Sequence, residues 1–177
     1  MDYAIVLYFD RDTEDYFNKI INDIAHSGVN NYIVDIKMPP HITVSFFHTN
    51  EINNIINLFD KNYLSFTTDT IIWASLGVFI PQVLYAAPVL SKYLLDVCDK
   101  TNQLIKPYAE GGVSELYLPY NWVPHTSLAL KLNHNELKIS FDIAIQQFTA
   151  ITGKSNRLAL AECNPYKEIK IWDLKRT

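Results

Sequence analysis

The sequence has few cysteines and no long hydrophobic run. Of its 177 residues only Cys98 and Cys163 are cysteine, and they form no Cys-x-x-Cys pair, which argues against a disulfide framework or a cysteine zinc site. No segment approaches the roughly 18 apolar residues that span a bilayer. The N-terminus also lacks the basic and apolar regions of a secretory signal. We therefore expect a cytoplasmic protein with two free thiols and no membrane partner.

Positive charge is also scarce. The chain has 15 lysines and arginines against 19 aspartates and glutamates, which gives a net charge of −4, and its basic residues are scattered. Proteins that bind duplex nucleic acid usually carry a basic stripe, because their affinity comes from neutralising many phosphates. We therefore expect a small nucleotide or an RNA end as the partner, and no duplex. The hydrophobic fraction of 49% indicates a globular fold.

Apolar periodicity predicts alternating strands and helices. Apolar, β-branched and aromatic runs indicate strands at 3–9, 31–37, 41–47, 64–70, 71–79, 82–87, 125–132, 157–163 and 168–174. Helical spacing indicates helices between Asp12 and Gly28, at 51–60, from Pro88 to Pro107 and at 134–147. A strand, a helix and then a strand that begins Pro-His occur in this order twice, which suggests two similar halves.

Two short segments share a pattern of polar residues. PHITVSF at 40–46 and PHTSLAL at 124–130 each contain a proline, a histidine and, two residues after the histidine, a hydroxyl residue. Because side chains alternate between the two faces of a strand, each histidine lies beside its hydroxyl residue. The same alternation adds further residues to these faces: Ser45 and Phe47 in the first motif, Ala129 and Lys131 in the second.

Two imidazoles and two hydroxyls suit the cleavage of a phosphodiester. A neutral imidazole takes a proton from the attacking group, a protonated imidazole gives one to the leaving oxygen, and the hydroxyls bind the non-bridging oxygens. Histidine serves both roles because its unperturbed pKa is about 6.5, so we expect a bell-shaped rate profile with limbs near neutrality. One such motif is more often a structural sheet residue, whereas two matched copies favour a functional pair.

The remaining histidines do not form a cluster. They are His26, His48 and His134. His41 and His48 are an odd number of residues apart, so a regular strand points them to opposite faces. The chain also lacks a Gly-rich phosphate loop of the Walker type. We expect no metal site and no cofactor.

The two motifs resemble those of the two-histidine (2H) phosphoesterase superfamily, also called LigT-like or 2′-5′ RNA ligase-like proteins. The resemblance rests on HITV at 41–44, HTSL at 125–128, the lead-in YNWVPH at 120–125, and the segments 83–105 and 158–174. It implies an α+β fold in which residues 1–177 form one bilobal domain. Two mostly antiparallel sheets then face a central cleft, with helices on the outside, and each lobe contributes one motif.

The roles of the family's motif residues carry over to four positions. The resemblance implies that His41 and His125 are the catalytic pair and that Thr43 and Ser127 hold the phosphate. Ser127 stands where many members have threonine, and it keeps the hydrogen-bond donor. The implied activity is that of a metal-independent phosphodiesterase that acts on a 2′,3′-cyclic phosphate or a 2′-5′ linkage of a small nucleotide or RNA end.

Two alternatives to an enzyme stay open at this point. The first is a module that binds a nucleotide in the same cleft without turnover. The second is a structural interaction protein, in which the two motifs do not meet. In each case we expect a monomer.

Several residues near the motifs have two interpretations. Tyr120 and Trp122 either stack on a base or pack within a loop. Lys131 is either a positive charge at the rim of an anion site or a solvated strand end. Tyr8 on the first strand either reaches the cleft or lies in the core, and we expect the core.

Overall fold

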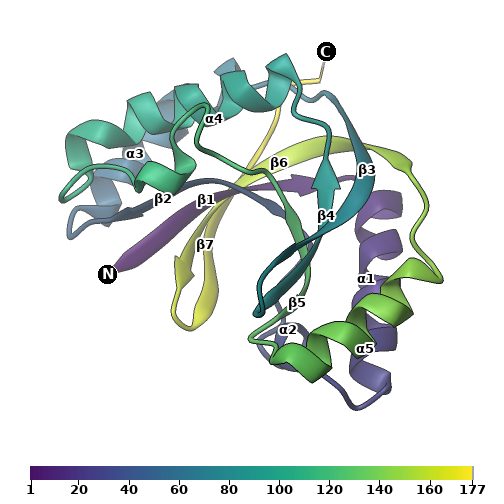
Figure 1. The fold of residues 1–177 in the computed structure, drawn as a ribbon. Helices are drawn as coiled ribbons and strands as arrows, with labels where there is room; N and C mark the ends of the chain where they lie inside the picture. The colour runs from purple at the N-terminus through teal and green to yellow at the C-terminus, as the bar shows by residue number, and fades with distance from the viewer. Residues whose placement is uncertain (177) are drawn as a thin grey trace.

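The computed structural model describes residues 1–176 and contains helices on the outside of a strongly bent sheet (Figure 1). The α-helices are α1 Arg11–His26, α2 Tyr32–Asp35, α3 Ile52–Asn62, α4 Lys92–Ile105 and α5 His134–Ile145. Three short 3₁₀ helices are η1 Tyr63–Ser65, η2 Lys106–Tyr108 and η3 Glu115–Tyr117. The strands are β1 Asp2–Phe9, β2 Ile42–His48, β3 Thr70–Phe79, β4 Val83–Pro88, β5 Thr126–Leu130, β6 Ile151–Cys163 and β7 Tyr166–Asp173.

All seven strands belong to one antiparallel sheet, joined through the long strand β6. The order is β2-β1-β6-β3-β4-β5, with β7 also paired to β6. Residues 151–154 of β6 pair with β3, whereas residues 157–163 pair with β7. The α+β fold with two facing sheets is thus confirmed, and the two sheets are halves of one. One half holds β1, β2 and β7, and the other holds β3, β4 and β5 (Figure 1).

The order of elements repeats along the chain. β1, α1, β2 and α3 are followed, after β3, by β4, α4, β5 and α5. The helices cross between the halves, because α1 packs against β5 and α5, whereas α4 packs against β2. Helix α1 begins where the Asp10 carboxylate accepts the N–H of Thr13, a typical N-cap. Each half of the sheet is therefore covered by a helix that the other half supplies.

One hydrophobic core cluster runs through both halves. It includes Leu7 of β1, Phe17 of α1, Trp73 of β3 and Leu128 of β5. Phe17 and Trp73 pack edge to face, with ring centroids 5.1 Å apart. Within residues 1–176, no helix combines the length and apolar character needed to cross a bilayer.

Three predicted elements were wrong. Residues 31–37 contain the short helix α2 in place of a strand, because hydrogen bonds close within the segment and no strand pairs with it. Residues 64–70 form η1 and an extended segment that joins β3 only at Thr70. Pro88 ends β4 and opens no helix. Helix α4 begins at Lys92, where the Ser91 hydroxyl accepts the N–H of Leu94.

Candidate active site

The two histidines begin their strands in the same way. The Nδ1–H of His41 donates to the carbonyl of Pro39 at 2.7 Å, and that of His125 donates to the carbonyl of Val123 at 2.9 Å. A carbonyl only accepts, so Nδ1 carries the hydrogen in both rings. The proline between each histidine and its carbonyl partner fixes the backbone angle φ. Nε2 of each imidazole is therefore left for a second partner.

Each motif contains a β-bulge at the same position. Thr43 pairs with Val6 and Ser45 pairs with Ile5, so Val44 is an extra residue between the two pairs. In the second motif the register shift falls in the same place, with Leu128 as the extra residue. A bulge turns the residues after it to the other face. The two motifs thus match in backbone geometry as well as in sequence.

Because of the bulges, the residues that follow Thr43 and Ser127 do not lie on the strand faces that regular alternation predicted. Ser45 and Phe47 are 0% and 2% exposed, and Ala129 is 1% exposed, so these three lie in the interior. Phe46 and Leu130 instead line a cavity that also contains His41 and Thr43. Regular alternation was the wrong assumption here, because the extra residue shifts the period by one.

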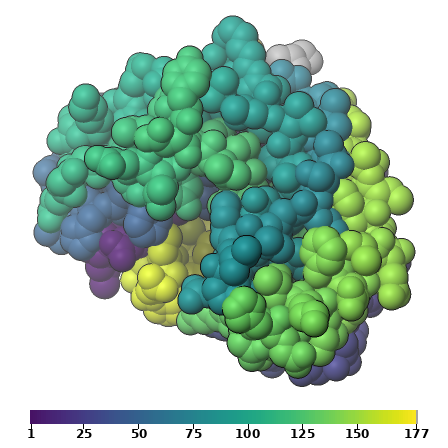
Figure 2. Space-filling view, viewed as in Figure 1, coloured from purple at the N-terminus to yellow at the C-terminus, as the bar shows by residue number. Residues whose placement is uncertain are grey.

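A cavity of about 320 Å³ contains His41 and Thr43, and we call it the His41 cavity. Both halves of the sheet line it. The first half and its β6–β7 turn contribute His41, Thr43, Phe46, Asn164 and Tyr166, and the second half contributes Gln82, Val83, Leu130 and Lys131. Figure 2 shows the surface hollowed where the β6–β7 turn, in yellow, faces the β3–β4 turn, in teal.

A second cavity, of about 350 Å³, contains His125, and we call it the His125 cavity. Its lining has no charged residue and consists of Phe79, Leu116, Tyr117, Asn121, Trp122, Val123 and His125. Tyr117 also lines the His41 cavity, so the two cavities adjoin at its ring. This ring stacks on Phe46, with centroids 6.0 Å apart. We refer to the two cavities together as the cleft.

The histidines have aromatic surroundings of different kinds. His41 lies against Tyr8 and Tyr166, at centroid distances of 6.3 and 5.9 Å. His125 lies against Phe79 and Tyr85, at 5.0 and 5.3 Å. Tyr8, which we expected in the core, is 1% exposed. These rings remove water from both imidazoles.

Burial lowers the pKa of both imidazoles. The pKa of His41 falls to about 4: burial is the main cause, the hydrogen bond to the Pro39 carbonyl opposes it, and the charge of a protonated His125 adds to it. Burial also lowers the pKa of His125 below its ordinary value, against the hydrogen bond to Val123, which raises it. The effect of one histidine on the other means that the two rings lie close enough to interact. In the free protein, the lowered pKa values therefore favour the neutral form of both histidines.

The low pKa of His41 predicts a loss of stability in acid. In the unfolded chain its pKa returns to about 6.5, so between that value and about 4 the unfolded state binds more protons and stability falls as pH falls. We expect His41 to remove about 3 kcal/mol of unfolding free energy between pH 7.5 and pH 4. Urea unfolding at the two pH values measures this, with His41→Gln as the comparison. An equal loss in that variant would contradict the prediction.

The hydroxyls of Thr43 and Ser127 are available to a ligand. In the part of the chain that the structure describes, neither makes a hydrogen bond to the protein, and neither is fully enclosed. Thr43 lines the His41 cavity, and Ser127 is half-buried on β5, paired with Tyr85 of β4. The neighbouring Thr126 differs, because its buried hydroxyl accepts the indole N–H of Trp73 at 3.0 Å. The motif hydroxyls thus keep their hydrogen-bonding capacity.

The three other predicted site residues, Lys131, Trp122 and Tyr120, lie in different environments. Lys131 lines the His41 cavity, and its ammonium group lies 4.2 Å over the ring of Tyr32. Trp122 is 4% exposed and donates its indole N–H to the Thr43 carbonyl at 3.1 Å, which favours the packing interpretation over base stacking. Tyr120 is 90% exposed and lines neither cavity, so nothing in its position supports stacking.

The sequence analysis missed Tyr117 and Tyr166. Tyr117 lies eight residues before His125, and its carbonyl accepts a hydrogen bond of 2.6 Å from the buried Asn102 of α4. Tyr166 directly follows the Asn164-Pro165 turn that the sequence predicted. The signal was an aromatic residue close to a turn, but the tertiary fold alone brings these rings to the cleft.

Residues 1–176 contain no group of three or more histidine, cysteine, aspartate or glutamate side chains that is arranged to hold a metal ion. His48 lies apart from the cleft residues, beside Asp2 at 3.2 Å. Both cysteines are free, and burial raises the pKa of each thiol to about 12.

No protein-family model and no curated protein sequence matches this chain. Solved structures match it along almost its whole length. TT0787 of Thermus thermophilus has a TM-score of 0.65 at 12% identity, with 99% of both chains covered. E. coli LigT in its apo form has a TM-score of 0.61 at 11% identity, with 98% of this chain and 97% of LigT covered.

Two further structures extend the comparison. The complex of E. coli LigT with 3′-AMP has a TM-score of 0.57 at 10% identity, with 97% of both chains covered. Usb1 of Kluyveromyces marxianus has a TM-score of 0.52 at 9% identity, with 98% of this chain and 97% of Usb1 covered. At these identities the likeness shows the fold, which is the predicted LigT-like fold.

Proposed function

We propose that this chain is a phosphodiesterase that cleaves a 2′,3′-cyclic phosphate or a 2′-5′ linkage in a small nucleotide or at an RNA end. The main support is the matched pair of Pro-His motifs. Among residues 1–176, Nε2 of each histidine and the hydroxyl two residues later make no hydrogen bond to the protein, and the two histidines line adjoining cavities. A phosphorus atom between the two rings would then meet an acid, a base and two hydrogen-bond donors.

In this proposal His41 is the general base and His125 the general acid. Burial lowers the pKa of His41 more strongly than that of His125, so a single proton shared by the pair rests on His125. The negative charge of a bound phosphate favours that proton. Neutral His41 then takes a proton from the attacking water or hydroxyl through Nε2, and His125 gives its Nε2 proton to the leaving oxygen.

The lining of the cleft supports a nucleotide with few phosphates. Lys131 is the one lysine or arginine in the described lining of either cavity. The His125 cavity presents Leu116, Tyr117 and Val123, which suit the face of an uncharged base. The LigT-like fold and the LigT complex with 3′-AMP agree with such a ligand.

Turnover of matched substrates tests this function. Purified protein is incubated with adenosine 2′,3′-cyclic phosphate, a 2′-5′ diadenylate and a 3′-5′ diadenylate, and the products are separated by chromatography. We expect cleavage of at least one of the first two substrates. Tight binding of these compounds without product would support the nucleotide-binding module, and neither binding nor product would support the structural interaction protein.

The rate profile is expected to be bell-shaped and displaced toward acid. Because kcat/KM reports the free enzyme, its acid limb lies near pH 4, where His41 gains a proton, and its other limb lies below 6.5, where His125 loses one. Burial thus moves both limbs to lower pH than the near-neutral values expected from unperturbed imidazoles. EDTA is expected to leave the rate unchanged. A rate lost with EDTA and restored by a divalent ion would contradict this mechanism.

A further inference from the structure

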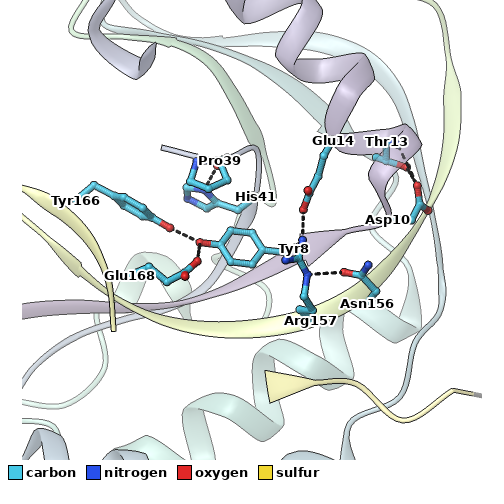
Figure 3. A network of polar contacts seen from close by, with 10 residues as sticks. All are labelled: Tyr8, Asp10, Thr13, Glu14, Pro39, His41, Asn156, Arg157, Tyr166 and Glu168. Atoms are coloured by element: carbon cyan, nitrogen blue, oxygen red, sulfur yellow. Dashed lines mark hydrogen bonds and ion pairs between the residues drawn. The ribbon is translucent and has the colours of Figure 1, made fainter. Parts of the chain in front are cut away.

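The two motifs match in sequence and backbone but have different surroundings. His125 lies against Phe79 and Tyr85. Tyr85 packs over Gly77, where a Cβ would come within 2.5 Å of its ring. His41 lies between Tyr8 and Tyr166, which are joined through their hydroxyls (Figure 3). The two motifs therefore differ in the aromatic rings that contact their imidazoles.

The rings of Tyr166 and Tyr8 enclose His41 from two directions. Tyr166 stacks on the imidazole with an interplanar angle of 18°, whereas Tyr8 meets it edge-on at 83°. A stacked ring blocks one face of the imidazole and limits its tilt. Since Nδ1 is held by the Pro39 carbonyl, these contacts fix the direction of Nε2.

Tyr166 is itself held in place. The Tyr8 hydroxyl donates to Glu168 Oε2 at 2.9 Å, so the Tyr166 hydroxyl is the donor in its bond to Tyr8 (Figure 3). Arg157 lies 5.2 Å over the Tyr8 ring and pairs with Glu14 at 2.6 Å. Burial raises the pKa of the Tyr166 hydroxyl to about 12, and it raises the pKa of the Tyr8 hydroxyl well above its ordinary range, so both keep their protons near neutral pH.

We propose that Tyr166 is a positioning residue, which holds the His41 imidazole with Nε2 toward the cleft and keeps water from its face, and that Tyr8 and Glu168 fix Tyr166. Its effect on turnover rests on the proposed function. Its effect on the ring of His41 does not, since that is a property of the unliganded protein.

Few charged groups face His41 from the elements around it. His125 is close enough for its charge to act on His41, and Lys131 and Cys163 line the same cavity as His41. Glu168 and Arg157 lie behind the tyrosines, in contact with Tyr8. Among residues 1–176 no carboxylate bonds to the imidazole, so the exclusion of water is what Tyr166 controls.

The test compares Tyr166→Ala and Tyr166→Phe, with Tyr120→Ala as the matched control at an exposed tyrosine outside both cavities. The pKa and tautomer of His41 are followed by NMR of histidine labelled with ¹⁵N and ¹³C, assigned with His41→Gln. In Tyr166→Ala we expect the pKa of His41 to rise by about one unit or more toward its ordinary value. The acid limb of the kcat/KM profile should move to higher pH by the same amount, and kcat should fall about tenfold.

The conservative variant separates positioning from general structure. Tyr166→Phe keeps the stacked ring and loses only its bond to Tyr8, so its His41 pKa and acid limb should lie closer to those of the parent protein and of Tyr120→Ala than to those of Tyr166→Ala. A loss of activity in Tyr166→Ala with His41 unmoved in NMR and in the pH profile would overturn the proposal. So would a phenylalanine variant as impaired as the alanine variant.

Two further outcomes have defined meanings. If Tyr166→Ala does not fold, Tyr166→Leu takes its place, since its smaller side chain keeps part of the packing but leaves room for water beside the imidazole, and it should raise the His41 pKa by less than alanine would. If the parent protein turns over no substrate, the proposed function fails, while the NMR titration still decides the role of Tyr166.

Discussion

Replacing either His41 or His125 with alanine is expected to lower kcat on a 2′,3′-cyclic nucleotide by about 10²–10⁴-fold. Each substitution removes a group that transfers a proton in the transition state. Both imidazoles lie at the cleft with one nitrogen bonded to the backbone, so the fold loses little else. Steady-state kinetics measure the loss, and circular dichroism and thermal unfolding confirm that the variants are folded.

The matched control for the histidine pair is His134→Ala. His134 is the exposed first residue of α5, outside both cavities, and its replacement should leave kcat unchanged. Because the two histidines act as a unit, the double variant should be about as impaired as the worse single one. A single variant that retains more than about a tenth of the parent kcat would contradict the acid–base mechanism.

Thr43→Val and Ser127→Ala are each expected to lower kcat by about 10²–10³-fold. Their hydroxyls would donate to the non-bridging oxygens, on which negative charge collects in the transition state. Both hydroxyls lack a partner among residues 1–176, so their removal leaves no buried group unpaired and should hardly change the unfolding free energy. Kinetics and urea unfolding on the same samples measure the two effects.

Thr126→Val gives the reverse pattern and serves as the control for the hydroxyl variants. Its hydroxyl points into the core, where it accepts the N–H of Trp73. Removal leaves that indole nitrogen unpaired at a cost of about 1–3 kcal/mol in stability. Below its unfolding temperature the variant should keep the parent kcat. If Ser127→Ala lost stability but not rate, the phosphate-binding role of Ser127 would be wrong.

Local sequence was sufficient for the motif strands. Each Pro-His pair sets one backbone angle and starts a β-branched or aliphatic strand, and His41, Thr43 and His125 line the cleft, with Ser127 half-buried two residues beyond His125. Alternation failed directly after the hydroxyl residues, where Val44 and Leu128 form bulges. A bulge depends on how the neighbouring strand pairs, and a single segment carries no such information.

The loop that precedes the second motif shows a second limit. Trp122 and Tyr120 are both aromatic residues near the second motif, yet one is buried beneath Thr43 and the other is 90% exposed. Their loop has no periodicity that would distinguish them. Tyr117 reaches the cleft because Asn102 of α4 holds its backbone.

The sequence by itself determined the two Pro-His strands and their four polar side chains, because hydrophobic period and proline geometry act over a few residues. The fold class came from the resemblance of these motifs to those of the 2H phosphoesterases. Only the tertiary structure decided that the strands line one cleft, that Tyr166 covers His41 alone and that the pKa of His41 falls to about 4. Burial and charge at a site arise from contacts between distant segments. Two motifs that are alike along the chain can therefore differ in chemistry once the chain has folded.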